Sequence, residues 1–339
     1  PMSSSRPLWR DEWPLLVVWA SALAWLLQGK GWIDGLSSLP GAAGFLIWVC
    51  LAILLSAFAV VRHADVLAER FGEPYGTMIL TFAVISLEVF MISALMLEGG
   101  QNTLARDTMY SVIMIVLAGL VGVCLLLGGI KFHEQSFNLR GASSYLSMII
   151  PLAAIGLVLP DFTRSSPYQV FSPPHAVALV ILSVAVYSVF LIVQTSRYRG
   201  FFTVPAETEG LHPHVESSRS NFLHAALLII YIVPVVLLAK KLAGVLDFTT
   251  EASGLPVAFG GLIVATLILA PEGLSAVQSA LNNQLQRSVN ILLGSVLATI
   301  GLTIPAALAI GLATGQEVTL GLAPAEVTML LIILAVSML

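Results

Sequence analysis

The sequence predicts an all-α polytopic membrane protein, built from one leading helix and two inverted five-helix repeats. Of its 339 residues, 58% are hydrophobic and only 10% are charged, and the mean hydropathy is +0.94. A soluble domain carries about 25% charged residues, so the bilayer is the main solvent of this chain. The apolar residues gather in runs long enough to span a membrane. Two of these runs each carry one glutamate deep inside, and the two glutamates are 184 residues apart.

The apolar runs predict the helices in order. A spanning helix needs about 20 mostly apolar residues, and every backbone group in lipid must be paired within the segment. We expect helices at about residues 13–29, 41–61, 74–98, 107–129, 142–160, 175–196, 221–241, 256–281, 288–313 and 322–339. The segments "VVRHADVLAERFGEP" and "GGIKFHEQSFNLRGA" are expected as short polar connections, and "KKLAGVLDFTTEASG" as a polar turn.

The longest polar stretch, Arg197 to Ser220, is expected to link two halves. The predicted division is residues 1–40 for the N-terminus and leading helix, 41–197 for the first repeat, 198–220 for a cytoplasmic linker, and 221–339 for the second repeat. Orientation follows from the excess of Lys and Arg on the cytoplasmic side. One side holds Arg6, Arg10, Arg62, Arg70, Lys131, Arg140, Arg197, Arg199, Arg219 and Arg287, and the other holds Lys30, Arg106, Arg164, Lys240 and Lys241. The N-terminus is therefore expected in the cytoplasm, in the inner membrane of a bacterium.

An internal repeat relates the two halves. Adding 184 to each residue number places Glu88 on Glu272 and Ser111 on Ser295. The same shift places the second to fifth predicted helices on the seventh to tenth. Weak internal symmetry of this kind is typical of transporters. The helix at 175–196 should then have a partner near 359–380, so an eleventh helix is expected beyond Leu339.

The two glutamates are the candidate ligands for a cation and for protons. No other charge occurs from Gly76 to Leu97 around Glu88. An ionised carboxylate inside a span costs about 2.5–3.5 kcal/mol on insertion scales, and such acids are functional by default. A cation or a proton would offset that cost. Two carboxylates balance one divalent ion, and they supply at most four of the roughly 6–8 oxygens that calcium takes. Burial and a nearby like charge both favour the protonated form of a carboxyl group, so the pair can hold protons when the cation is absent. The two groups would titrate jointly.

Further oxygens are expected from hydroxyl groups or from freed backbone carbonyls. Ser111 and Ser295 are candidate ligands, but serines in membrane helices also bond to their own backbone or lie at helix contacts, so both roles stay open. For Thr299 we favour packing over a ligand role. Pro271 directly precedes Glu272, and proline removes one helical donor, so a helix break is expected there.

The quoted segments also resemble a known family. "RFGEPYGTMILTFAVISLEVFMISALM", "RDTMYSVIMIVLAGLVG", "APEGLSAVQSALNNQLQRSVNILLGSVLATIGLTIP" and "LIVQT" are similar to the bacterial ChaA-type calcium/proton antiporters, in the CAX branch of the cation/calcium exchangers. The resemblance implies eleven helices and a site in which Glu88 and Glu272 bind the cation and protons. It implies calcium as the leading substrate, with sodium or potassium as alternatives. Two features depart from the family: Ile85 and Leu269 stand where many members have asparagine, and the linker has few acids.

Other functions fit the sequence less well. An intramembrane enzyme would need a paired-acid motif or a histidine-rich cluster, so no enzyme activity is expected. A cation channel would not require a proton-titrating acid in each half. Cys50 and Cys124 lie in apolar runs and imply no disulfide framework or zinc site, and His212 and His214 are expected in a solvated loop. The expected partners are the lipid bilayer, inorganic cations and protons, with no cofactor and no nucleic acid; a homo-oligomer stays open.

Overall fold

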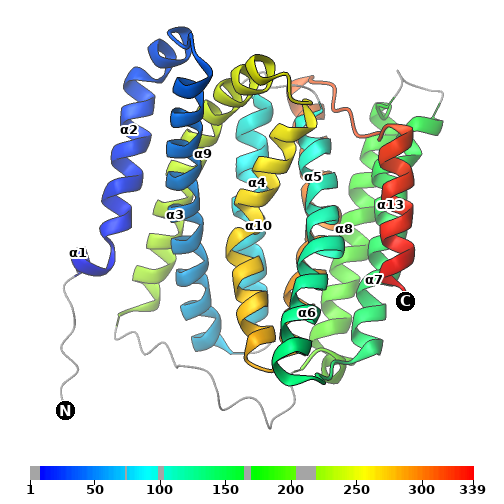
Figure 1. Ribbon diagram of the computed structural model, residues 1–339. Coiled ribbons are helices and arrows are strands. Elements are labelled where there is room, and N and C mark those ends of the chain that lie inside the picture. Colours follow the sequence, from blue (N-terminus) through cyan, green and yellow to red (C-terminus); the bar gives the residue numbers. More distant parts are fainter. Residues whose placement is uncertain (1–7, 73–74, 98–102, 164–168, 204–218) are drawn as a thin grey trace, which may run out of the picture. The chain divides into compact units, whose positions relative to one another are not determined.

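The computed structural model describes residues 8–72, 75–97, 103–163, 169–203 and 219–339 (Figure 1). The chain divides into two compact units. Unit 1 comprises residues 1–101 and 214–260, and unit 2 comprises residues 102–213 and 261–339. Each unit takes helices from both predicted halves, so the units cut across the division at residues 198–220. The acids and histidines of the predicted linker lie outside the described residues.

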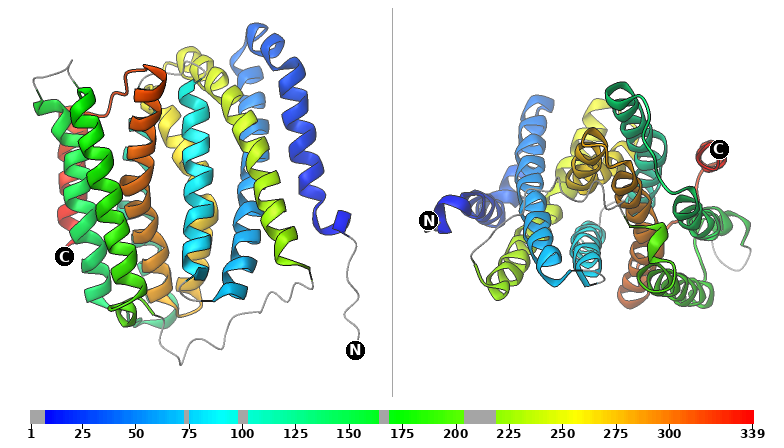
Figure 2. Two further views of the ribbon diagram at one scale, coloured as in Figure 1. Left: turned by 180° about the vertical axis from the view of Figure 1, so that it is seen from behind. Right: turned by 90° about the horizontal axis from the view of Figure 1, so that it is seen from below.

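Unit 1 is a set of helices that pack side by side (Figures 1 and 2). The short helix α1 (Leu8–Asp11) leads into α2 (Trp13–Asp34), which contacts α3 and α9. Its other helices are α3 (Leu39–Phe71), α4 (Tyr75–Leu97) and α9 (Asn221–Ser253). α3 and α9 pack against each other, and α4 contacts both of them. Unit 1 therefore holds the helix of Glu88 between two long neighbours.

The helices α3 and α9 extend well beyond their predicted ends. Each has 33 residues, or about 50 Å at 1.5 Å per residue, against a hydrocarbon core of about 30 Å. The expected polar connection after residue 61 and the expected turn after residue 239 are both helical, which corrects the sequence reading. Both segments are rich in Ala, Leu, Glu, Lys and Arg, which favour helix whether or not they face lipid. The helices end only where Gly72 and Gly254 adopt positive φ angles of 62° and 68°.

Unit 2 contains the remaining helices. The first of its long helices runs through α5 (Leu104–Met114), a π-helical segment η1 (Ile115–Leu120) and α6 (Val121–Phe132). The others are α7 (Leu139–Ala153) with its continuations η2 (Ala154–Val158) and η3 (Leu159–Phe162), α8 (Pro173–Thr195), the 3-10 turn η4 (Arg199–Phe201), α10 (Ala258–Leu281), α11 (Leu285–Ala298) with η6 (Thr299–Thr303) and α12 (Ile304–Thr314), and α13 (Pro324–Ser337). α10 begins three residues before this unit does.

The predicted spans are found as helices. In the described ranges, nine helices are long and apolar enough to cross a membrane, and Pro324–Ser337 is a shorter apolar helix. These ten correspond in order to the ten predicted segments. Local signals account for several of their ends. The Asn138 side chain accepts hydrogen bonds from the backbone N–H groups of Arg140 and Gly141 and so caps α7, and Ser220 caps α9 in the same way.

Candidate cation site

Glu272 is held by a serine of the next helix. It is the fifteenth of the 24 residues of α10, and it follows the buried apolar residues Ile268 and Leu269. The Ser295 hydroxyl of α11 donates a hydrogen bond of 2.5 Å to Glu272 Oε2. The structure thus brings together two of the predicted site residues and places the Ser295 hydroxyl beside the carboxyl group of Glu272. A hydrogen bond to a carboxylate stabilises its charged form, which partly offsets the cost of placing it in the span.

A tight turn sets this contact. α10 and α11 are separated by three residues, in which Asn283 adopts the left-handed conformation at φ 60° and Gln284 N–H donates to the Ser279 carbonyl. Asparagine tolerates that conformation better than most residues. Further along, the Ser288 hydroxyl donates to the Ala276 carbonyl at 2.6 Å. These contacts fix the register of α11 on α10, and with it the position of Ser295.

Pro271 does not break its helix. α10 runs from Ala258 to Leu281 with Pro271 inside it, which corrects the predicted break. Proline lacks one N–H group, so the Leu267 carbonyl loses its usual partner, but the remaining bonds of the neighbouring turns continue the helix. Pro271 therefore leaves one backbone carbonyl, that of Leu267, without its usual helical donor, and it does not divide α10 into two half-helices.

Each of the two helices that carry Ser111 and Ser295 contains a π-helical segment. η1 begins at Ile115, four residues after Ser111, and η6 begins at Thr299, four residues after Ser295. The two starting residues are related by the same offset of 184 as the two glutamates. Within unit 2, α5 contacts η6 and α11 contacts η1. π-helical turns are rare and occur often at functional sites. The matching positions of η1 and η6 therefore support the internal repeat through backbone geometry, independently of residue identity.

This region contains one further buried hydroxyl, that of Thr303, which was not among the residues predicted from the sequence. Thr303 closes η6, is 1% exposed, and its Oγ1 has no hydrogen-bond partner among the described residues. Most threonines in these helices donate to the carbonyl four residues earlier, as Thr249 does to Val245. For Thr303 that carbonyl, on Thr299, accepts instead from the backbone N–H of Ile304 in the π-helical pattern. The spacing of Ser295, Thr299 and Thr303, four residues apart, was the available signal.

Glu88 lies in α4, a helix of unit 1. It is the fourteenth of the 23 residues of α4, it is 3% exposed, and the buried side chains around it in the helix include Leu87, Met91 and Ile92. Ser111, by contrast, lies in unit 2 and is also buried. Because Glu88 belongs to unit 1 and Glu272 to unit 2, the shared site stays a prediction. Among the residues that the structure describes, no three His, Cys, Asp or Glu side chains gather as a metal-binding group.

Comparison with known proteins decides the family. The pattern of the sodium/calcium exchanger proteins matches residues 41–196 and 223–339, which is most of the chain. The chain belongs to the sodium/calcium exchanger family. It is therefore a multi-pass membrane protein of a transporter family, and the resemblance drawn from the sequence is confirmed.

Individual relatives agree with that assignment. The chain is 45% identical over 298 residues to the sodium-potassium/proton antiporter ChaA of Escherichia coli (strain K12), covering 86% of this chain and 81% of the relative. It is 40% identical over 339 residues to the putative ionic transporter y4hA of Sinorhizobium fredii, covering 98% of this chain and 89% of the relative. A Ca(2+)/H(+) antiporter of Synechocystis is 24% identical over 258 residues, covering 71% of this chain and 69% of the relative.

Solved structures show the same fold. Native YfkE superposes on this chain with a TM-score of 0.70 at 18% identity, covering 96% of this chain and 91% of that one. The H+/Ca2+ exchanger CAX gives a TM-score of 0.65 at 14% identity, covering 97% and 81%. At these identities the likeness concerns the fold alone. The predicted all-α, polytopic fold class is confirmed.

Proposed function

We propose that the chain is a secondary transporter that exchanges a cytoplasmic cation for protons. The observation that carries this proposal is Glu272, a carboxyl group in the middle of an apolar helix that accepts a hydrogen bond from Ser295 on a neighbouring helix. Glu88 occupies the equivalent position of the first half. The family and the names of the relatives, which include sodium-potassium/proton and Ca(2+)/H(+) antiporters, support the same reaction.

The mechanism we propose is competition for two carboxyl groups. In apolar surroundings the charged form of a carboxyl group is disfavoured, so Glu88 and Glu272 hold protons when no cation is bound. A cation displaces those protons because it stabilises both carboxylates at once. If the site opens to one side of the membrane at a time, each turnover moves cation one way and protons the other. The Ser295 hydroxyl and the carbonyl released by Pro271 supply additional oxygens.

The transported ion is proposed as Ca²⁺, Na⁺ or K⁺. The two negative charges match one Ca²⁺, which also needs several oxygens from hydroxyls, carbonyls or water. A monovalent ion balances one carboxylate and lets the other keep its proton. The relative at 45% identity is named a sodium-potassium/proton antiporter, which favours the monovalent ions more than the sequence reading did. With one charge balanced, Na⁺ and K⁺ should show a different proton dependence from Ca²⁺.

We also propose the location and orientation. The ten Lys and Arg residues on one side, against five on the other, place the N-terminus in the cytoplasm. The membrane would be the inner membrane of a bacterium. In this orientation α3 ends, and α9 begins, on the cytoplasmic side.

The test is ion-driven proton movement in proteoliposomes that contain purified protein and a pH-sensitive dye. Addition of Ca²⁺, Na⁺ or K⁺, one at a time, should move protons in the opposite direction. Glu88→Gln and Glu272→Gln should each abolish this movement, because either change removes a charge and a titrating group while keeping the size. Glu251→Gln, an exposed acid near the end of α9, is the matched control and should leave it unchanged.

The outcomes separate the alternatives. Proton movement driven by Na⁺ and K⁺ but not by Ca²⁺ would identify a monovalent cation antiporter. Dissipation of a cation gradient without any proton movement would identify a channel. Wild-type rates in both Gln variants would show that the two glutamates are not the exchange site.

A further inference from the structure

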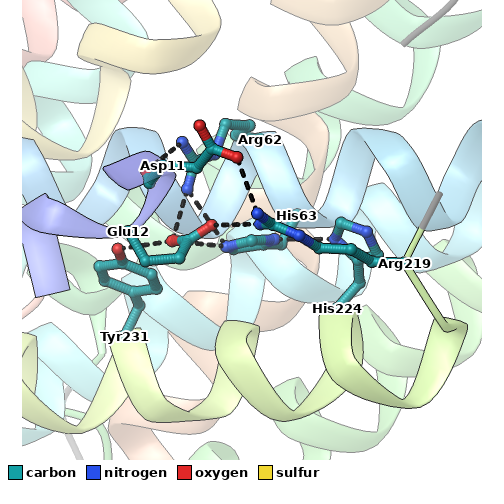
Figure 3. Close-up of polar contacts among 7 residues, drawn as sticks. All are labelled: Asp11, Glu12, Arg62, His63, Arg219, His224 and Tyr231. Atoms are coloured by element: carbon teal, nitrogen blue, oxygen red, sulfur yellow. Dashed lines mark hydrogen bonds and ion pairs between the residues drawn. The ribbon is translucent and has the colours of Figure 1, made fainter. Parts of the chain in front are cut away.

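A buried polar cluster lies where α1 meets α3 and α9 in unit 1 (Figure 3). Its centre is Glu12, the residue that precedes α2, which is 6% exposed. Glu12 Oε2 accepts hydrogen bonds from Arg62 at 2.7 Å and from the Tyr231 hydroxyl at 2.9 Å, and it lies 3.4 Å from His63 Nε2. The exchange mechanism uses none of these groups.

Two histidines meet inside this cluster. His63 of α3 and His224 of α9 are 2% and 4% exposed, and their Nδ1 atoms are 2.9 Å apart (Figure 3). A contact of that length between two ring nitrogens is a hydrogen bond only if one nitrogen carries a proton and the other does not. The pair therefore tolerates at most one positive charge. With two charges, both Nδ1 atoms would carry hydrogen and the contact could not persist.

The neighbouring charges decide how the pair responds to pH. Arg219 forms ion pairs with Asp11 at 2.7 Å and with Glu12 at 3.5 Å, and Arg70 donates to the Arg219 carbonyl and to Asn221. α3 also carries Asp65 and Glu69, and from α4 the described titratable side chain at this end is Tyr75, which is exposed. Burial opposes ionisation of Glu12, but hydrogen bonds from His63 and Tyr231 and the charge of Arg62 outweigh it and lower its pKa to about 2. Glu12 thus stays charged throughout the range in which histidines titrate.

We propose that the His63–His224 pair is a proton-binding site, separate from the two glutamates, that controls how the start of α9 packs on the segment containing Asp11 and Glu12. At neutral and alkaline pH the pair is closed and Glu12 is bonded to α3 and α9. A second proton, bound on acidification, forces the two rings apart. His63 stays beside the Glu12 carboxylate, His224 moves away, and the start of α9 loosens from the segment containing Asp11 and Glu12.

The pH window follows from simple titration. An isolated imidazole titrates near pH 6.5. Burial of His224, the first charge of the pair and the guanidinium groups of Arg70 and Arg219 disfavour the second proton, so opening is expected well below pH 6.5, as the pH falls towards 4. In the proposed orientation the cluster faces the cytoplasm. The site would therefore respond to strong acidification on that side independently of the ion that occupies the exchange site.

The test is a distance measurement that does not depend on transport. Nitroxide labels are attached to Arg10→Cys on α1 and Phe222→Cys at the start of α9, both exposed positions, in a chain in which Cys50 and Cys124 are replaced by alanine. Pulsed electron resonance then gives the distance distribution in nanodiscs from pH 8 to pH 4. We expect one narrow distance at pH 8 and a second, longer population that grows as the pH falls towards 4.

Glutamine variants decide whether the histidines are responsible. Glutamine can form a hydrogen bond but does not titrate, so His63→Gln combined with His224→Gln should make the distribution independent of pH. His175→Gln, an exposed histidine of α8, is the control and should keep the wild-type response. If the double variant is not recovered as a folded protein, His224→Gln alone is measured and should also lose the response. A distribution that does not change with pH in the wild type, or a change that survives in the glutamine variants, would overturn the proposal. Exchange rates do not enter this readout, so it stands apart from the two-glutamate site.

Discussion

Ser295 gives Glu272 a hydrogen-bond donor within a span whose other side chains near that carboxyl group are mainly apolar. A donor at that position favours the ionised carboxylate over the protonated form. Under the proposed exchange mechanism, Ser295 would therefore favour cation binding over proton binding. It would also add one oxygen to those offered to the ion.

Ser295→Ala should raise the apparent KM for the cation. A hydrogen bond to a charged group contributes about 1.5–3 kcal/mol, which corresponds to a rise of about ten- to a hundredfold. Raising the pH should recover part of the loss, because the proton competes less. Ser295→Thr keeps the hydroxyl and should restore most of the affinity. The measurement is initial exchange rate against cation concentration at several pH values.

Ser188→Ala is the control for that change, because the Ser188 hydroxyl donates to the Val184 carbonyl of its own helix. It should leave the cation KM unaltered. An unaltered KM in Ser295→Ala as well would show that the contact with Glu272 has only a packing role.

Glu12 makes a second prediction at the scale of one residue. Its pKa is lowered to about 2, so the folded protein binds this proton less well than the unfolded chain does. The stabilisation is therefore fully present above about pH 4.5 and is lost as the pH falls towards 2. A difference of that size corresponds to about 3 kcal/mol near neutral pH. Glu12→Gln should lower the melting temperature at pH 7, and the difference from wild type should narrow below about pH 4.5.

Glu134→Gln provides the comparison for Glu12→Gln, because Glu134 is an exposed acid in the loop between α6 and α7. It should melt like the wild type in thermal denaturation at every pH tested. Equal melting temperatures for Glu12→Gln and wild type at pH 7 would contradict a stabilising role for the cluster around Glu12.

At the scale of elements, the segment η6 packs closely on α8. A Cβ atom at Gly301 would lie 3.0–3.2 Å from the Cδ2, Cβ and Cγ atoms of Tyr187. These distances are below ordinary van der Waals contact, so a larger residue must displace the buried tyrosine. The absence of a side chain at Gly301 thus lets the π-helical turn approach α8, and it keeps Thr299 and Thr303 in the interior.

Gly301→Ala should destabilise unit 2 by about 1–3 kcal/mol, as overpacking of a core does. Gly119→Ala is the matched control, since Gly119 lies in the other π-helical segment and a Cβ there would meet nothing within 4 Å. That control should be neutral or slightly stabilising, because alanine favours helix over glycine. Thermal denaturation in detergent measures both variants, and equal melting temperatures would rule out the proposed packing constraint.

At the scale of the whole molecule, the hydrophobicity of the sequence predicted the number and order of the membrane spans, but it did not predict where each helix ends. The ten spans were predicted because burial in lipid requires long apolar runs, and such runs are visible without any alignment. The ends of α3 and α9 were not predicted, because both helices continue into polar segments. In α3, for example, the residues from Arg62 to Arg70 have the polar composition of a loop, but most of them are residue types that favour helix. Polarity reports where a chain leaves the bilayer, and a helix does not have to end there.

The candidate site was predicted in part, for similar reasons. Glu272 and Ser295 were selected because polar groups inside an apolar span carry a cost, and the structure joins them by a hydrogen bond. The break at Pro271 was wrong because a single missing donor does not interrupt a helix. Thr303 was missed because a threonine in a membrane helix normally satisfies itself, and only the π-helical turn takes its acceptor away. Backbone geometry of that kind is not encoded in composition or in spacing.

The matching π-helical segments also bear on the history of the chain. If the two halves descend from one five-helix unit by gene duplication, a turn found at corresponding places in both was present before the copy was made. In that case both copies have kept the extra residue that widens the turn, although few of the surrounding residues are identical. Deleting one residue would rotate everything beyond it by about 100° around the helix axis, moving the flanking side chains to another face. Such a turn resists gradual change, which makes it a more durable marker of common ancestry here than residue identity.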